Sequence, residues 1–124
     1  MSRKVLVIDD DASIREVIRL TLEHVAGWQV EDAPDATAGL AAALARPPDA
    51  VLLDVMMPGT DGPATLQLLR ADDRSAGLPV VFLTAKIMRE ERARLEAMGA
   101  VGVIAKPFDP MQLPGLISDA LGWV

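Results

Sequence analysis

Short, valine-rich apolar runs alternate along the chain with longer amphipathic stretches, and this alternation restricts the possible folds more than any other feature. Four of the five runs are almost continuously apolar, as strands buried on both faces of a parallel sheet are. The run from 28 to 33 alternates between apolar and polar residues, so we expect it at an edge of the sheet. The runs predict five strands: Lys4–Ile8, Trp28–Ala33, Ala50–Leu53, Pro79–Leu83 and Val101–Ala105.

The stretches between these runs have the spacing of amphipathic helices. Strand–helix alternation repeated along a chain predicts an α/β fold, here a doubly wound parallel sheet with right-handed crossovers and helices on both faces. The length of 124 residues fits one domain with one core, so we expect residues 1–124 to form a single domain.

The first helical stretch, from 12 to 25, is capped either by Asp11 or by a capping box of Ser13 and Glu16. Asp35 is the expected cap of the second helix. The apolar positions that we expect on one face of the first helix are Ile14, Val17, Ile18, Leu22 and Val25.

The two C-terminal helical stretches are less regular. The stretch from 86 to 99 is mostly charged and offers only Met88, Leu95 and Met98 as a narrow apolar stripe, so we expect it to be weakly held. Pro114 interrupts the last stretch, and a proline inside a helix removes a hydrogen bond and clashes with the preceding turn. The last helix therefore either starts late or kinks.

The composition excludes several classes of function. A net charge of −6 and an aromatic content of 3% argue against direct nucleic-acid binding, which uses a basic surface and stacking rings. The absence of cysteine excludes a disulfide framework and any thiolate site. The N-terminal segment has the pattern of neither a signal peptide nor a membrane span. We therefore expect a cytoplasmic protein that contacts neither nucleic acid nor membrane directly and reaches DNA, if at all, through a partner.

Polar residues directly follow four of the five predicted strands. Asp9 and Asp10 follow the first strand, Asp54 the third, Thr84 the fourth and Lys106 the fifth. The carboxyl ends of parallel strands meet at one edge of the sheet, which is where ligands of such folds bind. We therefore expect three carboxylates, a hydroxyl and an ammonium group to share one pocket, although Thr84 could also cap the fourth helix.

Three neighbouring carboxylates can coexist if a divalent cation lies among them. Hard oxygen donors without histidine or cysteine favour Mg²⁺, or Mn²⁺, over zinc. Asp54 is the best-placed nucleophile because it stands alone after a central strand, whereas the adjacent Asp9 and Asp10 suit metal binding. Lys106 and Thr84 would donate to the oxygens of an incoming phosphoryl group. Without metal, the crowding should raise the pKa of at least one carboxylate.

Four motifs resemble the receiver domain of bacterial two-component response regulators: VLVIDDD, VLLDVMMPGTDG, VVFLTA and KPF, in this order. The resemblance covers Lys4 to Leu121 and is closest in kind to stand-alone, chemotaxis-regulator-like receivers. It implies a flavodoxin-like sheet of five strands in the order 2-1-3-4-5, with five helices. It also implies a phosphorylation-dependent switch in a two-component phosphorelay, which receives its phosphoryl group from a histidine kinase or phosphotransfer protein and signals to an unidentified downstream protein.

The resemblance implies roles for the residues around the third strand. Asp54 would be the phosphoacceptor, assisting its own phosphotransfer and autodephosphorylation without being an enzyme. Asp10 would bind Mg²⁺ directly and Asp9 largely through water, together with Asp54 and the backbone carbonyl of Met56. The side chains of Met56 and Lys86 would tune the lifetime of the phosphoryl group.

The resemblance also implies roles at the ends of the fourth and fifth strands. Thr84, Ala85 and Lys106 would contact the phosphoryl group, and Thr84 would move and take the following loop with it. The Lys106–Pro107 peptide would be cis. Receivers often carry an aromatic residue three positions before this lysine as part of the switch, but this chain has Val103 there.

Two further features accompany the resemblance. Pro58, Gly59 and Gly62 match the turn after the third strand, where glycine permits unusual dihedral angles. No output domain follows Val124, so the chain is either a stand-alone receiver or part of a longer regulator or hybrid kinase.

A small Mg²⁺-dependent phosphatase of the haloacid-dehalogenase type is the alternative function. Such enzymes carry D-x-D after the first strand with the first aspartate as nucleophile, which Asp9 and Asp11 fit loosely, and Asp109 is a thin candidate for their further acid. A nucleotide-binding module of flavodoxin type is disfavoured, because the loop after the first strand is anionic and would repel phosphate.

Overall fold

The computed structural model describes residues 3–86 and 88–123. Its centre is a parallel sheet in the order β2-β1-β3-β4-β5, which confirms the expected order and places β2 at an edge. No strand boundary differs from its predicted position by more than one residue. The strands are β1 (Lys4–Ile8), β2 (Gln29–Ala33), β3 (Ala50–Asp54), β4 (Val80–Thr84) and β5 (Gly102–Ala105).

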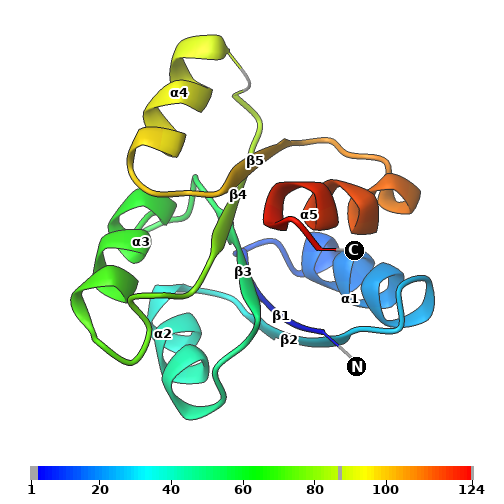
Figure 1. Ribbon diagram of the computed structural model, residues 1–124, viewed down its shortest axis with the longest axis horizontal. Coiled ribbons are helices and arrows are strands. Elements are labelled where there is room, and N and C mark those ends of the chain that lie inside the picture. The colour runs from blue at the N-terminus through cyan, green and yellow to red at the C-terminus, as the bar shows by residue number, and fades with distance from the viewer. Residues whose placement is uncertain (1–2, 87, 124) are drawn as a thin grey trace.

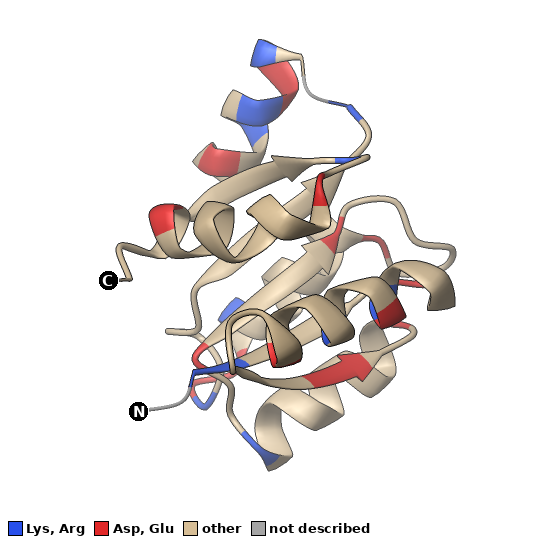
Figure 2. Ribbon diagram, turned by 90° about the vertical axis from the view of Figure 1, so that its right-hand side faces the viewer, with Lys and Arg blue, Asp and Glu red and all other residues tan. Residues whose placement is uncertain are grey.

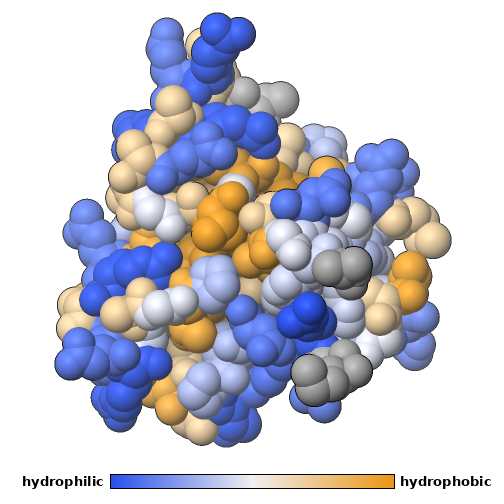
Figure 3. Space-filling model, viewed as in Figure 1, coloured by the Kyte–Doolittle hydropathy of each residue, from blue (hydrophilic) through white to orange (hydrophobic). Residues whose placement is uncertain are grey.

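Helices cover both faces of the sheet (Figure 1). α1 and α5 pack on one face, and α2, α3 and α4 pack on the other. On the face seen in Figure 3, most of the apolar residues gather near the middle of the view, and hydrophilic residues cover most of its periphery. The helices are α1 (Ala12–His24), α2 (Ala36–Ala45), α3 (Gly62–Ala71), α4 (Arg89–Ala97) and α5 (Leu113–Leu121), the last preceded by a 3₁₀ turn, Pro110–Gln112. Within the described ranges, none of the helices combines the length and apolar character needed to cross a membrane.

Asp11, rather than Ser13, caps α1. Its carboxylate accepts hydrogen bonds from the amides of Ser13 and Ile14 and so satisfies two donors of the first turn. Asp35 caps α2 as predicted, by accepting from the amide of Ala38.

The apolar face of α1 is narrower than its sequence predicts. Ile18 and Leu22 are fully buried against the sheet, but Val17 and Val25 are 40% and 51% exposed. The prediction that Val17 lies on the apolar face is wrong. Each residue turns the helix by about 100°, so Val17 points away from the row formed by Ile18 and Leu22. Val25 lies at the C-cap, past the last turn that packs on the sheet.

The last helix starts late and does not kink at Pro114. Its first residue is Leu113, so Pro114 lies in the first turn, where no intrahelical partner exists for a backbone N–H. Leu113 and Ile117 are fully buried and hold α5 on the sheet.

α4 is held by fewer apolar residues than predicted. Leu95 is fully buried and Met98 half-buried, but Met88 is 72% exposed at the N-cap, so its place in the apolar stripe is wrong. Charged residues of both signs cover the rest of the helix (Figure 2). Arg92 of α4 also donates to the backbone carbonyl of Val103 in β5.

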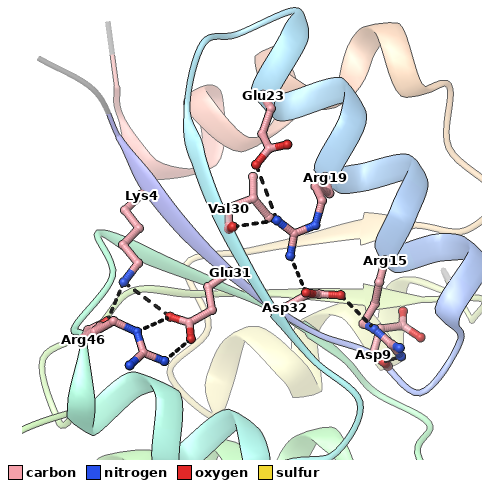
Figure 4. A network of polar contacts seen from close by, with 9 residues as sticks. All are labelled: Lys4, Asp9, Arg15, Arg19, Glu23, Val30, Glu31, Asp32 and Arg46. Atoms are coloured by element: carbon pink, nitrogen blue, oxygen red, sulfur yellow. Dashed lines mark hydrogen bonds and ion pairs between the residues drawn. The ribbon is translucent and has the colours of Figure 1, made fainter.

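Ion pairs flank both faces of the edge strand β2 (Figure 4). Glu31 pairs with Arg46, and this hydrogen bond lowers the pKa of the Glu31 carboxyl. On the opposite face Asp32 pairs with Arg15 and Arg19. Burial alone would raise the pKa of Asp32, but the hydrogen bonds and charges of the two arginines outweigh it and lower that pKa. Charges held in this way on an edge strand also discourage pairing with another chain.

Truncating Leu95 tests how α4 is attached. Leu95→Ala should lower the free energy of unfolding by about 2–5 kcal/mol, because it removes the only fully buried side chain of this completely described helix. Urea denaturation measures the loss, and hydrogen exchange should show it first within α4. The matched control is Leu68→Ala in α3, where the leucine is 47% exposed and the cost should stay below about 1 kcal/mol. Equal losses in the two variants would contradict this account of the helix.

Candidate functional site

The carboxyl ends of four strands bring the predicted polar residues to one edge of the sheet. Asp54 and Thr84 are the last residues of β3 and β4, Asp9 follows β1, and Lys106 follows β5. A cavity of about 250 Å³ opens at this edge, lined by Asp9, Asp10, Asp11, Ile14, Asp54, Met56, Ala85 and Lys106. Thr84 is buried and does not line this cavity.

Lys106 joins the two buried carboxylates of the site. Its Nζ lies 2.8 Å from Oδ2 of Asp9 and 3.2 Å from Oδ1 of Asp54. Burial would lower the pKa of the Lys106 ammonium group, but hydrogen bonding to Asp9 and the two negative charges outweigh it and raise that pKa. The group is therefore a fixed positive charge at neutral pH. The Lys106–Pro107 peptide is cis, as the resemblance implies.

Three carboxylates cluster as a metal site requires. Asp9, Asp10 and Asp54 each place one oxygen so that the three atoms lie within 4.8 Å of one another. These hard oxygen donors fit a cation such as Mg²⁺, which binds through a few carboxylates and keeps several waters. Asp10 is exposed and leaves the cluster open to solvent, whereas Asp9 is fully buried. Asp11 lies beside the cluster but caps α1 instead.

Asp54 has the perturbed pKa that crowding predicts, although crowding is not the largest cause. Burial contributes most and the negative charge of Asp9 adds to it, while the charge and hydrogen bond of Lys106 oppose both. The balance raises the pKa of Asp54 from 3.8 to about 6. The amide of Met56 donates to Oδ1 of Asp54 at 3.4 Å and lowers the pKa slightly.

The hydroxyl of Thr84 does not cap the fourth helix. α4 begins five residues later, at Arg89, with Met88 at the N-cap. Instead, Oγ1 of Thr84 accepts from the amide of Lys86 at 3.0 Å, and the Thr84 carbonyl accepts from the amide of Lys106 at 2.8 Å. The hydroxyl thus shapes the turn that follows β4, with Ala85 and Lys86 exposed at its surface.

Gly62 supports the site through close packing rather than through an unusual dihedral angle. A Cβ at this position would lie 2.3 Å from the carbonyl oxygen of Asp54 and 2.8 Å from Cα of Val55. The Gly62 amide donates to the Val55 carbonyl at 2.9 Å. Gly59 does have the expected positive φ, at 77°. The expected unusual dihedral angle is therefore confirmed for Gly59 but was the wrong reason for a glycine at position 62.

Arg15 is the residue near the site that sequence reasoning missed. It donates to the backbone carbonyl of Asp9 at 2.7 Å and to the carboxylate of Asp32 at 3.0 Å. Its position four residues after Asp11 on a helix with several charged residues carries no local signal of this contact. Only the packing of α1 against β2 brings the three residues together.

The fold and the site together define an α/β protein with an acidic, cation-compatible cavity at the carboxyl edge of a doubly wound sheet. A family model described as the response regulator receiver domain matches residues 5–118. The chain belongs to this family.

Individual relatives agree with the family. The chain is 39% identical over 106 residues to the DNA-binding dual master transcriptional regulator RpaA of Synechocystis, a match that covers 86% of this chain and 44% of RpaA. It is 35% identical to the phosphate regulon transcriptional regulatory protein PhoB of Pseudomonas aeruginosa, over 98% of this chain and 52% of PhoB. The chain thus spans about half the length of these curated relatives.

A solved structure has the same architecture over its full length. The chemotaxis response regulator CheY4 of Vibrio cholerae matches with a TM-score of 0.89 and 32% identity, covering 97% of this chain and 99% of CheY4. These comparisons give no support to a phosphatase of the haloacid-dehalogenase type.

The packing of Gly62 against Asp54 generates one prediction. Gly62→Ala should lower the free energy of unfolding by about 1–3 kcal/mol or more, because the added methyl group displaces the backbone that carries the Asp54 side chain. Chemical denaturation measures this loss. Gly115→Ala in α5 is the matched control, since a Cβ there meets open space, and it should be neutral or stabilise by up to about 1 kcal/mol. Similar losses for both glycines would show that Gly62 is not tightly packed.

The raised pKa of Asp54 generates a second prediction. A carboxyl whose pKa is higher in the folded state than in the unfolded state stabilises only while it is protonated, so its ionisation destabilises the fold as the pH rises from about 4 to about 6. In EDTA, the free energy of unfolding of Asp54→Asn should therefore equal that of the wild type below pH 4. Above pH 7 it should be higher than that of the wild type, by at most about 3 kcal/mol. Unfolding curves across this pH range measure the difference, and a difference that does not change with pH would contradict the assignment.

Proposed function

We propose that this chain is a phosphorylation-dependent signalling switch in a two-component phosphorelay, with Asp54 as the phosphoacceptor. The observation that carries the proposal is the position of the Lys106 ammonium group, which lies between Asp9 and Asp54 at one side of a three-carboxylate cluster. A nucleophilic carboxylate, a cation-compatible acidic site and a fixed positive charge are the parts that phosphoryl transfer to an aspartate needs.

Asp9, Asp10, Asp54 and the backbone carbonyl of Met56 would hold Mg²⁺, or Mn²⁺. When bound, the ion would supply positive charge that offsets the carboxylates and the incoming phosphoryl oxygens. Bound cation would also keep Asp54 ionised at neutral pH, since a nearby positive charge lowers a carboxyl pKa.

In the transfer itself, a carboxylate oxygen of Asp54 forms a bond to phosphorus while the bond from phosphorus to the nitrogen of a phosphohistidine breaks. Thr84, Ala85 and Lys106 would contact the phosphoryl oxygens. Hydrolysis of the resulting acyl phosphate returns the carboxylate, and the exposed side chains of Met56 and Lys86 would tune its rate. The chain in this account assists its own phosphorylation and dephosphorylation and is not an enzyme acting on other substrates.

The donor would be a histidine kinase or phosphotransfer protein in the cytoplasm, and the recipient of the signal an unidentified downstream protein. Residues 1–124 would act as one receiver domain without direct contact with membrane or nucleic acid, consistent with the net charge of −6. With Val103 in place of an aromatic residue, the switch would depend on Thr84 and the loop before α4.

Phosphorylation in vitro tests the assignment of Asp54. With acetyl phosphate and Mg²⁺, the wild type should gain the mass of one phosphoryl group, and Asp54→Asn should gain none. EDTA should suppress the reaction, because the crowded carboxylates then repel the donor. Intact-protein mass spectrometry measures all three.

Two further variants complete the design. Asp73→Asn, an exposed carboxylate just after α3, is the matched control and should label like the wild type. Asp9→Asn should be phosphorylated slowly but still at Asp54. A phosphatase of the haloacid-dehalogenase type would instead be phosphorylated at Asp9, so its Asp9→Asn variant would gain no phosphoryl group. Label on Asp54→Asn would overturn the proposal.

A further inference from the structure

We propose that Arg15 is a positioning residue for the acidic site, because its hydrogen bond to the Asp9 carbonyl holds the peptide unit between Asp9 and Asp10. The inference rests on the proposed function in that it concerns the same cation site. It assigns to α1 and β2 a part in orienting that site's carboxylates.

The guanidinium group of Arg15 spans two acceptors, one just after β1 and one within β2. Its Nη1 donates to the carbonyl oxygen of Asp9 at 2.7 Å, and its Nε donates to Oδ2 of Asp32 at 3.0 Å (Figure 4). A guanidinium is planar and its donors have fixed directions, so contact at two points restricts its orientation. The Arg15 side chain is only 17% exposed, which limits screening of both contacts by solvent.

The Asp32 end of this bridge is itself held in place. Asp32 accepts a second charge-assisted hydrogen bond, from Arg19 one turn further along α1. Arg19 also donates to the backbone carbonyl of Val30 at 3.1 Å. Asp32 lies within β2 and is also held by Arg15, so it would keep its place without Arg19, whereas only Arg15 connects it to the Asp9 carbonyl.

Asp9 has its other polar groups engaged elsewhere. Oδ1 accepts from the amide of Asp11 at 2.9 Å, Oδ2 accepts from Lys106 at 2.8 Å, and the Asp9 amide donates to the Ala33 carbonyl at 3.1 Å. The Asp9 carbonyl is the remaining group, and it belongs to the peptide unit that leads into Asp10. Since Asp10 is exposed, the direction of its carboxylate is set by this backbone rather than by packing.

Simple electrostatics predicts the opposite effect of removing Arg15. A positive charge near a cation site repels the cation, so deleting the charge should tighten Mg²⁺ binding. A positioning role predicts weaker binding, because carboxylates that are free to turn must be ordered when the cation arrives. The sign of the change in affinity therefore separates the two explanations.

Mg²⁺ titration of the metal-free full chain by isothermal calorimetry tests the inference. Arg15→Ala should bind Mg²⁺ about 10-fold more weakly than the wild type, or worse, as is usual when a residue that orients a metal ligand is lost. Arg19→Ala is the matched control: it removes the same charge, from the same helix and the same partner Asp32, but has no contact with the Asp9 carbonyl. Its affinity should be unchanged or slightly tighter.

A second set of measurements separates positioning from a general loss of stability. Arg15→Lys keeps the charge but cannot span both acceptors, so it should keep most of the stability while binding Mg²⁺ more weakly. In EDTA, hydrogen exchange at the Asp11 amide, which donates to Asp9, should be faster in Arg15→Ala than in Arg19→Ala.

Equal Mg²⁺ affinities and equal Asp11 exchange in Arg15→Ala and Arg19→Ala would overturn the inference. The proposed function fails differently, because the wild type itself would then bind no Mg²⁺ at the carboxylates. The wild-type titration therefore identifies which of the two is wrong.

Discussion

The buried ion pairs of Lys106 are the interaction on which the rest of the site depends. One ammonium group at the end of β5 contacts carboxylates at the ends of β1 and β3, and so links three strands at the edge where the cavity opens. Asp9 is fully buried and Asp54 nearly so. Buried carboxylates without a partner cost several kcal/mol each, which a domain of this size could not sustain twice. Lys106 therefore makes the acidic site compatible with a folded chain before any cation binds.

The compensation that Lys106 provides is incomplete, and this incompleteness is useful for the proposed chemistry. Three carboxylates face one ammonium group, and burial, together with the negative charge of Asp9, raises the pKa of Asp54 to about 6. A site with this excess has a reason to bind a divalent cation, since the cation removes repulsion that already exists. The apolar contacts of the sheet with its five helices offset the free-energy cost of this uncompensated charge. The residues that stabilise the core and the residues that would carry the chemistry thus lie in different parts of the molecule.

The sequence was sufficient to predict the sheet and the gathering of three aspartates and one lysine at its carboxyl edge, because both depend on local patterns. Continuous apolar runs mark strands buried on both faces, and the residue that follows each run must lie at the carboxyl edge. What the sequence did not predict depends on distances between elements. The contact of Arg15 with the Asp9 carbonyl and the packing of Gly62 against Asp54 arise only once helices are docked. Val17 was misplaced because helical periodicity alone does not fix how wide a buried stripe will be.

The two sides of the site differ in how firmly they are held, and this difference gives the proposed switch a direction. On the β1 side, Asp9 is fixed through its amide, its carbonyl and both carboxylate oxygens. On the β4 side, the turn after Thr84 is exposed, and α4 beyond it is fastened mainly by Leu95 and by the bond from Arg92 to the β5 backbone. Elements with few buried contacts have the lowest cost of displacement. A change of charge at Asp54 therefore meets less resistance toward α4 than toward α1, so the displacement that a partner detects would arise on the α4 side even without an aromatic residue in β5.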